Sequence, residues 1–137
     1  MDASDIATLI EKTARAVYEE RGPRAIHPGQ WAVLRFLSMA PHADRTVGGV
    51  AQFLGVTHAP ASRAVAALAR KELVSIATDA IDRRIRRIEI TGSGRELLSR
   101  DPVQRLAAAI TSLEDRDRDA LARILESLYS DLNGEAG

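Results

Sequence analysis

The residues with the clearest chemistry in this sequence are arginines grouped near its middle, at positions 83, 84, 86 and 87. Guanidinium groups bind phosphates, and a narrow minor groove of DNA gives them the strongest negative potential. The cluster therefore predicts a contact with nucleic acid, with Arg84 as the strongest candidate for the minor groove, followed by Arg83. Strand alternation sends Arg86 and Arg87 to opposite faces, so they rank lower. The alternative is a solvated surface in which Asp82 and Glu89 pair with some of these charges.

A second group of polar residues lies upstream of the arginines, in the first two turns of a helix predicted over residues 57–71. Short polar side chains and an arginine at such a position can reach base edges and phosphates in a major groove. Arg63 can bind a guanine through two hydrogen bonds or hold a phosphate, and the sequence leaves both open. The alternative is that Thr57 only caps the helix and Arg63 is a solvated charge. The candidate DNA-contacting residues of this helix are Thr57, His58, Ser62 and Arg63.

The distribution of charge agrees with a nucleic-acid partner for the middle of the chain. The 137 residues contain 19 Lys or Arg and 19 Asp or Glu, so the formal net charge is zero. Residues 46–100 nevertheless hold nine basic and five acidic residues, whereas residues 101–137 hold four and eight. This asymmetry is expected when a single segment meets phosphates.

Apolar spacing predicts four helices ahead of the arginine cluster. The first runs from an N-cap at Ser4 to about Arg21, where Gly22-Pro23 ends it, and the second runs from Pro28 to Ala40-Pro41. Thr46 caps a short third helix that stops at Gly55, and Thr57 caps the fourth. Two helices joined by a short turn that contains glycine form a helix-turn-helix.

The pattern then changes to that of strands, at residues 73–76 and 86–90, with a polar segment between them. These segments predict a charged hairpin, a wing over residues 76–88. Thr91 caps a fifth helix that reaches Ile110 and that Asp101-Pro102 could interrupt, and a last helix covers about 115–132. We therefore expect a mainly α (α+β) fold, a winged helix-turn-helix in the order ααααββαα.

The wing and its flanks resemble a known family. Asp82-Arg83-Arg84 followed by Ile90-Thr91-Gly92-Ser93-Gly94 resembles the "D-x-R … L-T-x-x-G" signature of the MarR family (multiple antibiotic resistance regulators). Residues 57–65 are similar to the recognition helix of that family, and Pro28-Gly29-Gln30-Trp31 to the start of its second helix. The order of the predicted elements matches along essentially the whole chain.

The resemblance implies a homodimer that binds double-stranded DNA at a pseudo-palindromic operator. Helix 57–71 would enter the major groove and wing 76–88 the minor groove, with Arg84 inserted and steadied by Asp82. The chain would be a single domain over 1–137, with residues 28–92 as the DNA-binding part, and 1–27 and 93–137 as the dimerisation part. The apolar residues of the first and last helices favour this dimer over a monomer in which both helices fold back on the core.

The resemblance also implies a small aromatic or phenolic effector between the dimerisation part and the winged helix. Arg15, Tyr18, His27 and Trp31 are the candidates for its pocket. The favoured alternative is that Trp31 is a core residue and Tyr18 a dimer contact, because aromatic residues at helical spacing usually pack. The sequence has no cysteine, which excludes disulfides and thiol-based sensing in this chain.

The predicted function is a sequence-specific transcription regulator, a repressor released by its effector. The alternative is a winged-helix module that binds protein, and an enzyme is the weakest interpretation because no phosphate-binding loop or catalytic triad motif is present. His27, His42 and His58 lack metal-ligand spacing, so neither a metal nor another cofactor is expected. A cytoplasmic location is expected, since the sequence shows neither a secretory signal nor a long apolar run.

Overall fold

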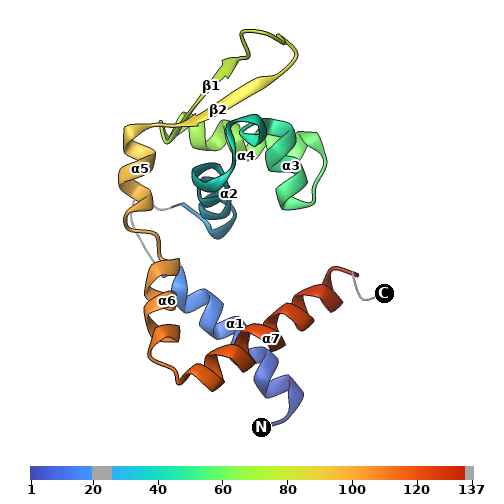
Figure 1. Cartoon of the computed structure of the whole chain (residues 1–137), viewed down its shortest axis with the longest axis vertical. Helices are drawn as coiled ribbons and strands as arrows, with labels where there is room; N and C mark the ends of the chain where they lie inside the picture. Colours follow the sequence, from blue (N-terminus) through green and yellow to red (C-terminus); the bar gives the residue numbers. More distant parts are fainter. Residues whose placement is uncertain (20–25, 135–137) are drawn as a thin grey trace. The chain divides into compact units, whose positions relative to one another are not determined.

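The computed structural model describes residues 1–19 and 26–134. It contains two compact units, residues 1–101 and 102–137. The elements of the first unit, shown in Figure 1, are α1 (Ala3–Val17), α2 (Pro28–Met39), the 3₁₀ turn η1 (His42–Asp44), α3 (Val47–Leu54), α4 (His58–Arg70), β1 (Val74–Thr78), β2 (Arg86–Ile90) and α5 (Gly92–Leu98). The second unit contains α6 (Val103–Thr111) and α7 (Asp115–Leu132). The predicted mainly helical fold with a two-stranded wing is confirmed.

Helix α1 begins earlier than the sequence analysis predicted. Its N-cap is Asp2, whose carboxylate accepts a hydrogen bond of 2.9 Å from the Asp5 amide, while the Asp5 carboxylate accepts one of 3.1 Å from the Asp2 amide. This reciprocal capping satisfies two amides at once, so the predicted cap at Ser4 is wrong. The helix ends at Val17 rather than near Arg21. The predicted stop at Gly22-Pro23 lies outside the described residues.

Two of the three predicted local signals of the helix-turn-helix, at Thr46 and Gly55, are present in the structure. The Thr46 hydroxyl accepts a hydrogen bond of 2.9 Å from the Gly49 amide and so caps α3. Gly55 ends this helix with a φ of 68°, a left-handed conformation that glycine adopts without a steric penalty. Thr57 occupies the N-cap position of α4, but its side chain makes no capping hydrogen bond.

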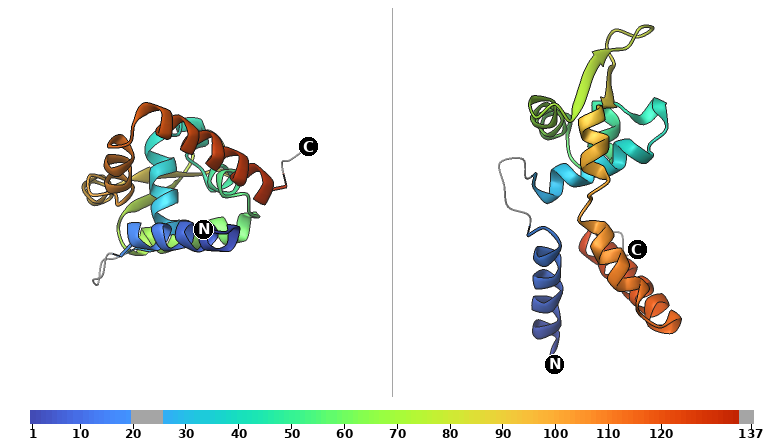
Figure 2. Two further views of the ribbon diagram at one scale, coloured as in Figure 1. Left: turned by 90° about the horizontal axis from the view of Figure 1, so that it is seen from below. Right: turned by 90° about the vertical axis from the view of Figure 1, so that its left-hand side faces the viewer.

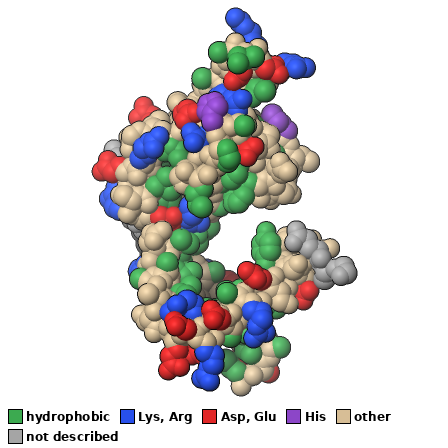
Figure 3. All heavy atoms as spheres, viewed as in Figure 1, with side chains coloured by type: hydrophobic (Ala, Val, Ile, Leu, Met, Phe, Trp, Pro, Cys, Tyr) green, Lys and Arg blue, Asp and Glu red, His purple; other side chains and the backbone are tan. Residues whose placement is uncertain are grey.

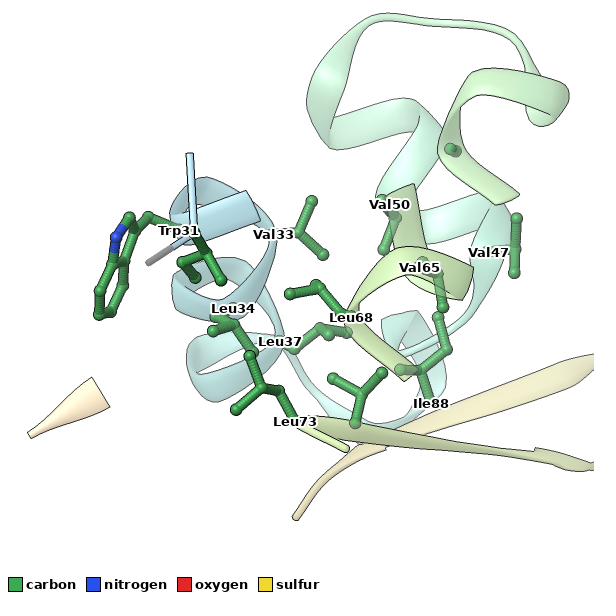
Figure 4. Packing of buried hydrophobic residues seen from close by; sticks show 13 residues of the cluster. Trp31, Val33, Leu34, Leu37, Val47, Val50, Val65, Leu68, Leu73 and Ile88 are labelled. Atoms are coloured by element: carbon green, nitrogen blue, oxygen red, sulfur yellow. The ribbon is translucent and has the colours of Figure 1, made fainter. Parts of the chain in front are cut away.

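The core of the winged helix is built where α2, α3 and α4 pack on the hairpin (Figure 4). Its largest fully buried side chains include Trp31 and Leu34 of α2, Leu68 of α4 and Ile88 of β2. Burying one such side chain stabilises the fold by about 1.5–3 kcal/mol. This packing holds α4 and the wing on one scaffold.

The hairpin pairs β1 with β2 in antiparallel register, with Ile76 opposite Ile88 and Thr78 opposite Arg86. The first strand therefore extends beyond the predicted end at residue 76. A short segment before α3 adds to the other edge of β2, through a bridge between Thr46 and Arg87 and a hydrogen bond of 2.9 Å from the Ile88 amide to the Arg45 carbonyl. Figures 1 and 2 show the hairpin projecting beyond the helices α2, α3 and α4 of its unit.

The predicted fifth helix is two helices, α5 and α6, with the interruption at the expected Asp101-Pro102 step. Proline has no amide hydrogen and disfavours a helical residue before it. Asp101 is only 6% exposed and accepts hydrogen bonds of 2.6 and 2.9 Å from the Arg35 guanidinium, which fixes this end of the first unit to α2. No helix in the described part of the chain is long and apolar enough to span a membrane.

Candidate nucleic-acid interface

One face of α4 is fixed in the core and the other is open. Ala61, Val65 and Leu68 are fully buried and follow helical spacing along the inner face. At the N-terminal end, Thr57, His58 and Arg63 are exposed, while Ser62 is only half-exposed. The core contacts thus leave three of the four predicted recognition residues on the solvent side.

The exposed side chains at this end of α4 make no polar bond to the other described residues. The side chains of Thr57, His58 and Arg63 make no hydrogen bond or ion pair within residues 1–19 and 26–134. The N-terminus of a helix also carries amides without helical partners and a partial positive charge, which favours phosphate. This end of α4 is therefore available to a DNA groove.

Arg84 lies in the loop of the wing, and its side chain is 91% exposed. Its guanidinium donates two hydrogen bonds of 3.1 Å, one to each carboxylate oxygen of Asp82. These bonds lower the pKa of Asp82 and raise the pKa of Arg84, so both groups are charged at neutral pH. Asp82 thus orients a solvent-exposed cation at the outer end of the hairpin, where Figure 3 shows basic side chains beside acidic ones.

The arginine cluster divides into an exposed and an internal part. Arg83 and Arg86 are exposed, and neither makes an ion pair with the described residues. Arg87 instead is 20% exposed and donates a hydrogen bond of 2.9 Å to Asp79, with two more to the carbonyls of His42 and Ala43 at 3.1 and 3.0 Å. Three arginines can therefore meet DNA, while the fourth is engaged within the protein.

Asp79 is a structural residue of the wing that the sequence analysis did not single out. Its carboxylate accepts hydrogen bonds from the Asp82 amide at 2.8 Å, from Arg87 at 2.9 Å and from the Ile81 amide at 3.0 Å. These bonds lower its pKa to about 2, with the Asp82 amide contributing most. An aspartate that begins a polar turn commonly accepts hydrogen bonds from the amides two and three residues further on. The position of Asp79 at the start of the polar segment could therefore have indicated this role in the sequence.

The four predicted effector residues have different partners. Arg15 pairs with Glu11 at 2.7 Å on exposed α1, and Tyr18 accepts a hydrogen bond of 2.9 Å from Arg35. His27 caps α2 by accepting a bond of 3.4 Å from the Gln30 amide, and Trp31 is 1% exposed in the core.

A small cleft of the first unit has a volume of about 70 Å³. It contains none of the predicted effector residues and is far smaller than a typical ligand pocket of roughly 300–1,000 Å³. Its lining comes from α2, the Arg45 segment, β2 and α5: Leu37, Ser38, Arg45, Glu89, Ile90, Arg95 and Leu98. Among the described residues, no group of three or more histidines and carboxylates is placed to hold a metal.

Comparison with known proteins agrees with this architecture. The sequence model of the MarR family matches residues 26–85. The MepR–DNA complex of S. aureus is 20% identical, covers 96% of this chain and 99% of its own, and has a TM-score of 0.76. The adhesin competence repressor AdcR of Streptococcus pyogenes is 14% identical over 96% of this chain and 98% of its own, with a TM-score of 0.71. S. aureus MepR bound to ethidium bromide is 22% identical over 96% and 97%, with a TM-score of 0.61.

No curated protein is significantly similar in sequence. The helix-turn-helix, its charged hairpin and the shared fold define a winged helix-turn-helix protein. The match to the MarR family covers α2, the helix-turn-helix, β1 and the loop of the wing, and the chain as a whole shares the fold of MepR and AdcR.

Proposed function

We propose that this chain is a homodimeric repressor that reads a pseudo-palindromic operator and is released by a small molecule. In each subunit α4 enters the major groove and the wing enters the minor groove. The observation that carries this proposal is Arg84, which is 91% exposed although Asp82 holds its guanidinium at both oxygens. An exposed, oriented guanidinium at the outer end of a hairpin suits a narrow minor groove.

The major-groove part of the proposal uses the open end of α4. Thr57, His58 and Arg63 are exposed there and unbonded to the described residues, and Ser62 is half-exposed beside them. A helix whose opposite face is buried presents these side chains on a rigid element, as base recognition requires. Arg83 and Arg86 supply further phosphate contacts from the wing.

Dimerisation is proposed from the terminal helices. Ile6, Leu9 and Ile10 of α1 are 44–48% exposed, and Ile124, Leu125 and Leu128 of α7 are 41–48% exposed. Apolar faces of this kind are buried by a second copy in a two-fold dimer, which also supplies two recognition helices about one DNA turn apart. Residues 1–27 and 93–137 then form the dimerisation part and 28–92 the DNA-binding part.

An effector is proposed because a relative of the same fold, MepR, has been solved with the aromatic cation ethidium. Arg15, Tyr18 and His27 are the candidates for contact with a small aromatic or phenolic effector. Trp31 is buried in the core and is no longer a candidate for direct contact. Release requires that the effector bind the DNA-free arrangement more tightly than the DNA-bound one. A cytoplasmic location is part of the proposal, because a DNA-binding regulator acts where the chromosome lies.

The test is fluorescence anisotropy with two labelled duplexes, one from the intergenic DNA next to the gene and one of random sequence, across a salt series. We expect tighter binding to the intergenic duplex and an affinity that falls steeply with salt. Arg84→Ala is expected to weaken this binding about tenfold, while Arg123→Ala on α7, which removes the same charge, leaves it near wild type. Equal, weak binding to both duplexes, unchanged by Arg84→Ala, would contradict the proposal and favour a protein partner.

A further inference from the structure

A chain of hydrogen bonds begins in η1, just before the helix-turn-helix, and ends at Arg84 in the wing. Arg87 donates from one terminal nitrogen to the carbonyls of His42 and Ala43, and from Nε to Asp79. The Asp79 carboxylate accepts from the amide of Asp82, whose own carboxylate holds Arg84. The guanidinium that reaches outward is thus connected through two carboxylates to an internal guanidinium.

The inner end of this chain lies directly before α3. His42 and Ala43 belong to η1, and the Asp44 carbonyl approaches Gly49 of α3 so closely that a Cβ there would lie 2.0 Å from it. The bridge from Arg87 to Thr46, the N-cap of α3, adds a second connection. Arg87 is therefore bonded both to the segment that leads into the helix-turn-helix and to the loop that carries Arg84.

We propose that Arg87 and Asp79 form a positioning pair that sets where the wing loop lies relative to the helix-turn-helix, and so sets operator affinity without touching DNA. This inference rests on the proposed DNA-binding function. Arg87 acts through Arg84: it fixes Asp79, Asp79 fixes the amide of Asp82, and Asp82 orients the outer guanidinium. Holding the loop in one arrangement before binding reduces the ordering cost of binding.

The sign of the effect separates positioning from simple charge attraction. Asp79 and Glu89 both place a carboxylate on the hairpin, but Glu89 pairs with Arg45 at 3.4 Å, lies 3.6 Å from Nδ1 of His42 and makes no bond to the described loop residues. Removal of either negative charge strengthens DNA binding if only charge matters. A positioning role instead predicts that Asp79→Ala weakens operator binding about tenfold, while Glu89→Ala does not weaken it.

A double-mutant cycle separates positioning from a direct phosphate contact. We expect Arg87→Ala to weaken operator binding about tenfold in the wild-type background and by less than about twofold in the Arg84→Ala background. A phosphate contact made by Arg87 itself would give additive losses, and it would lower the salt slope by about one for each contact. Arg87→Lys keeps the charge but lacks the planar fork, so positioning predicts a loss here as well.

A measurement without DNA tests the positioning step by itself and keeps its failure distinct from a failure of the proposed function. In amide hydrogen exchange, Arg87→Lys is expected to speed the exchange of the Ile81 and Asp82 amides, while the paired amides of β1 and β2 keep wild-type protection. Unchanged protection of these two amides would overturn the inference whether or not the protein binds an operator. Tighter binding by Asp79→Ala, wild-type binding by Arg87→Lys or additive losses in the cycle would also overturn it. Folding of each variant is checked by its thermal unfolding midpoint.

Discussion

The N-terminal end of α4 and the wing are organised in opposite ways. At the end of α4, Thr57, His58 and Arg63 are held only by the backbone of the helix, because their side chains bind no other described residue. In the wing, Asp82 accepts hydrogen bonds from Nε and one terminal nitrogen of Arg84, and Asp79 accepts three hydrogen bonds. One region has a regular helical backbone with unbonded side chains, and the other is a loop whose backbone is held by side-chain hydrogen bonds.

This difference follows from the secondary structure that each region uses. A helix satisfies its own backbone and needs no side chain to keep its shape, so its polar residues remain free to read bases. A seven-residue loop between two strands cannot do so, and it uses carboxylates and a guanidinium to satisfy its amides. The α4 residues can therefore adjust to sequence, whereas Arg84 is oriented before DNA arrives.

The largest expected effect comes from a change at the scaffold that both regions share. A Cβ at Gly94 would lie 2.2 Å from the Leu73 carbonyl, between the end of α4 and the base of the wing. We expect Gly94→Ala to lower the free energy of unfolding by about 3 kcal/mol or more, measured by urea unfolding. Gly92→Ala, where a Cβ meets nothing within 4 Å, is the matched control and is expected to keep wild-type stability. Equal stability of the two variants would show that the close packing is absent.

A change on α4 alone sharpens the comparison. Arg63→Ala is expected to lose about 1–3 kcal/mol of operator binding, with unchanged folding, as measured by anisotropy against operators altered at single positions. If Arg63 reads a base, preference at one base pair is lost. If it holds a phosphate, binding weakens on every sequence and the salt slope falls by about one for each contact. If Arg63→Ala binds every duplex as tightly as the wild type, Arg63 does not contact DNA.

The wing is expected to respond to acid through Asp79. Its folded-state pKa, about 2, lies below the ordinary value of 3.8, so the contribution of this group to stability is complete above about pH 4–5 and is lost as the pH falls toward 2. The thermal midpoint of the wild type should therefore fall more steeply between pH 4 and 2 than that of Asp79→Asn. If the thermal midpoints of the two proteins fall in parallel with pH, the Asp79 carboxylate does not make the stabilising hydrogen bonds described above.

The sequence predicted the elements whose signals are local. Thr46 and Gly55 mark the ends of α3 by a hydroxyl cap and a left-handed residue, and strand periodicity located β2. The cap of α1 was misplaced because both Asp2 and Ser4 are good capping residues, and the additional partner at Asp5 decides between them.

The internal role of Arg87 and the close approach at Gly94 depend on contacts between segments far apart in the chain. Strand alternation separates Arg86 from Arg87, but it does not tell which of the two faces the carbonyls of His42 and Ala43. The groove contacts of Thr57, His58, Ser62, Arg63, Arg83, Arg84 and Arg86 stay predictions, as does an effector site near Arg15, Tyr18 and His27.

The most direct test of the account is hydroxyl-radical footprinting on the intergenic operator with wild-type protein and Arg84→Ala. We predict two-fold symmetric protection, with the two inner regions that face α4 about one helical turn apart and outer minor-groove regions that face the wings. Arg84→Ala should lose the outer protection and keep the inner one. Protection that is uniform along the duplex, or outer protection that survives in the variant, would contradict the assignment of α4 and the wing to the two grooves.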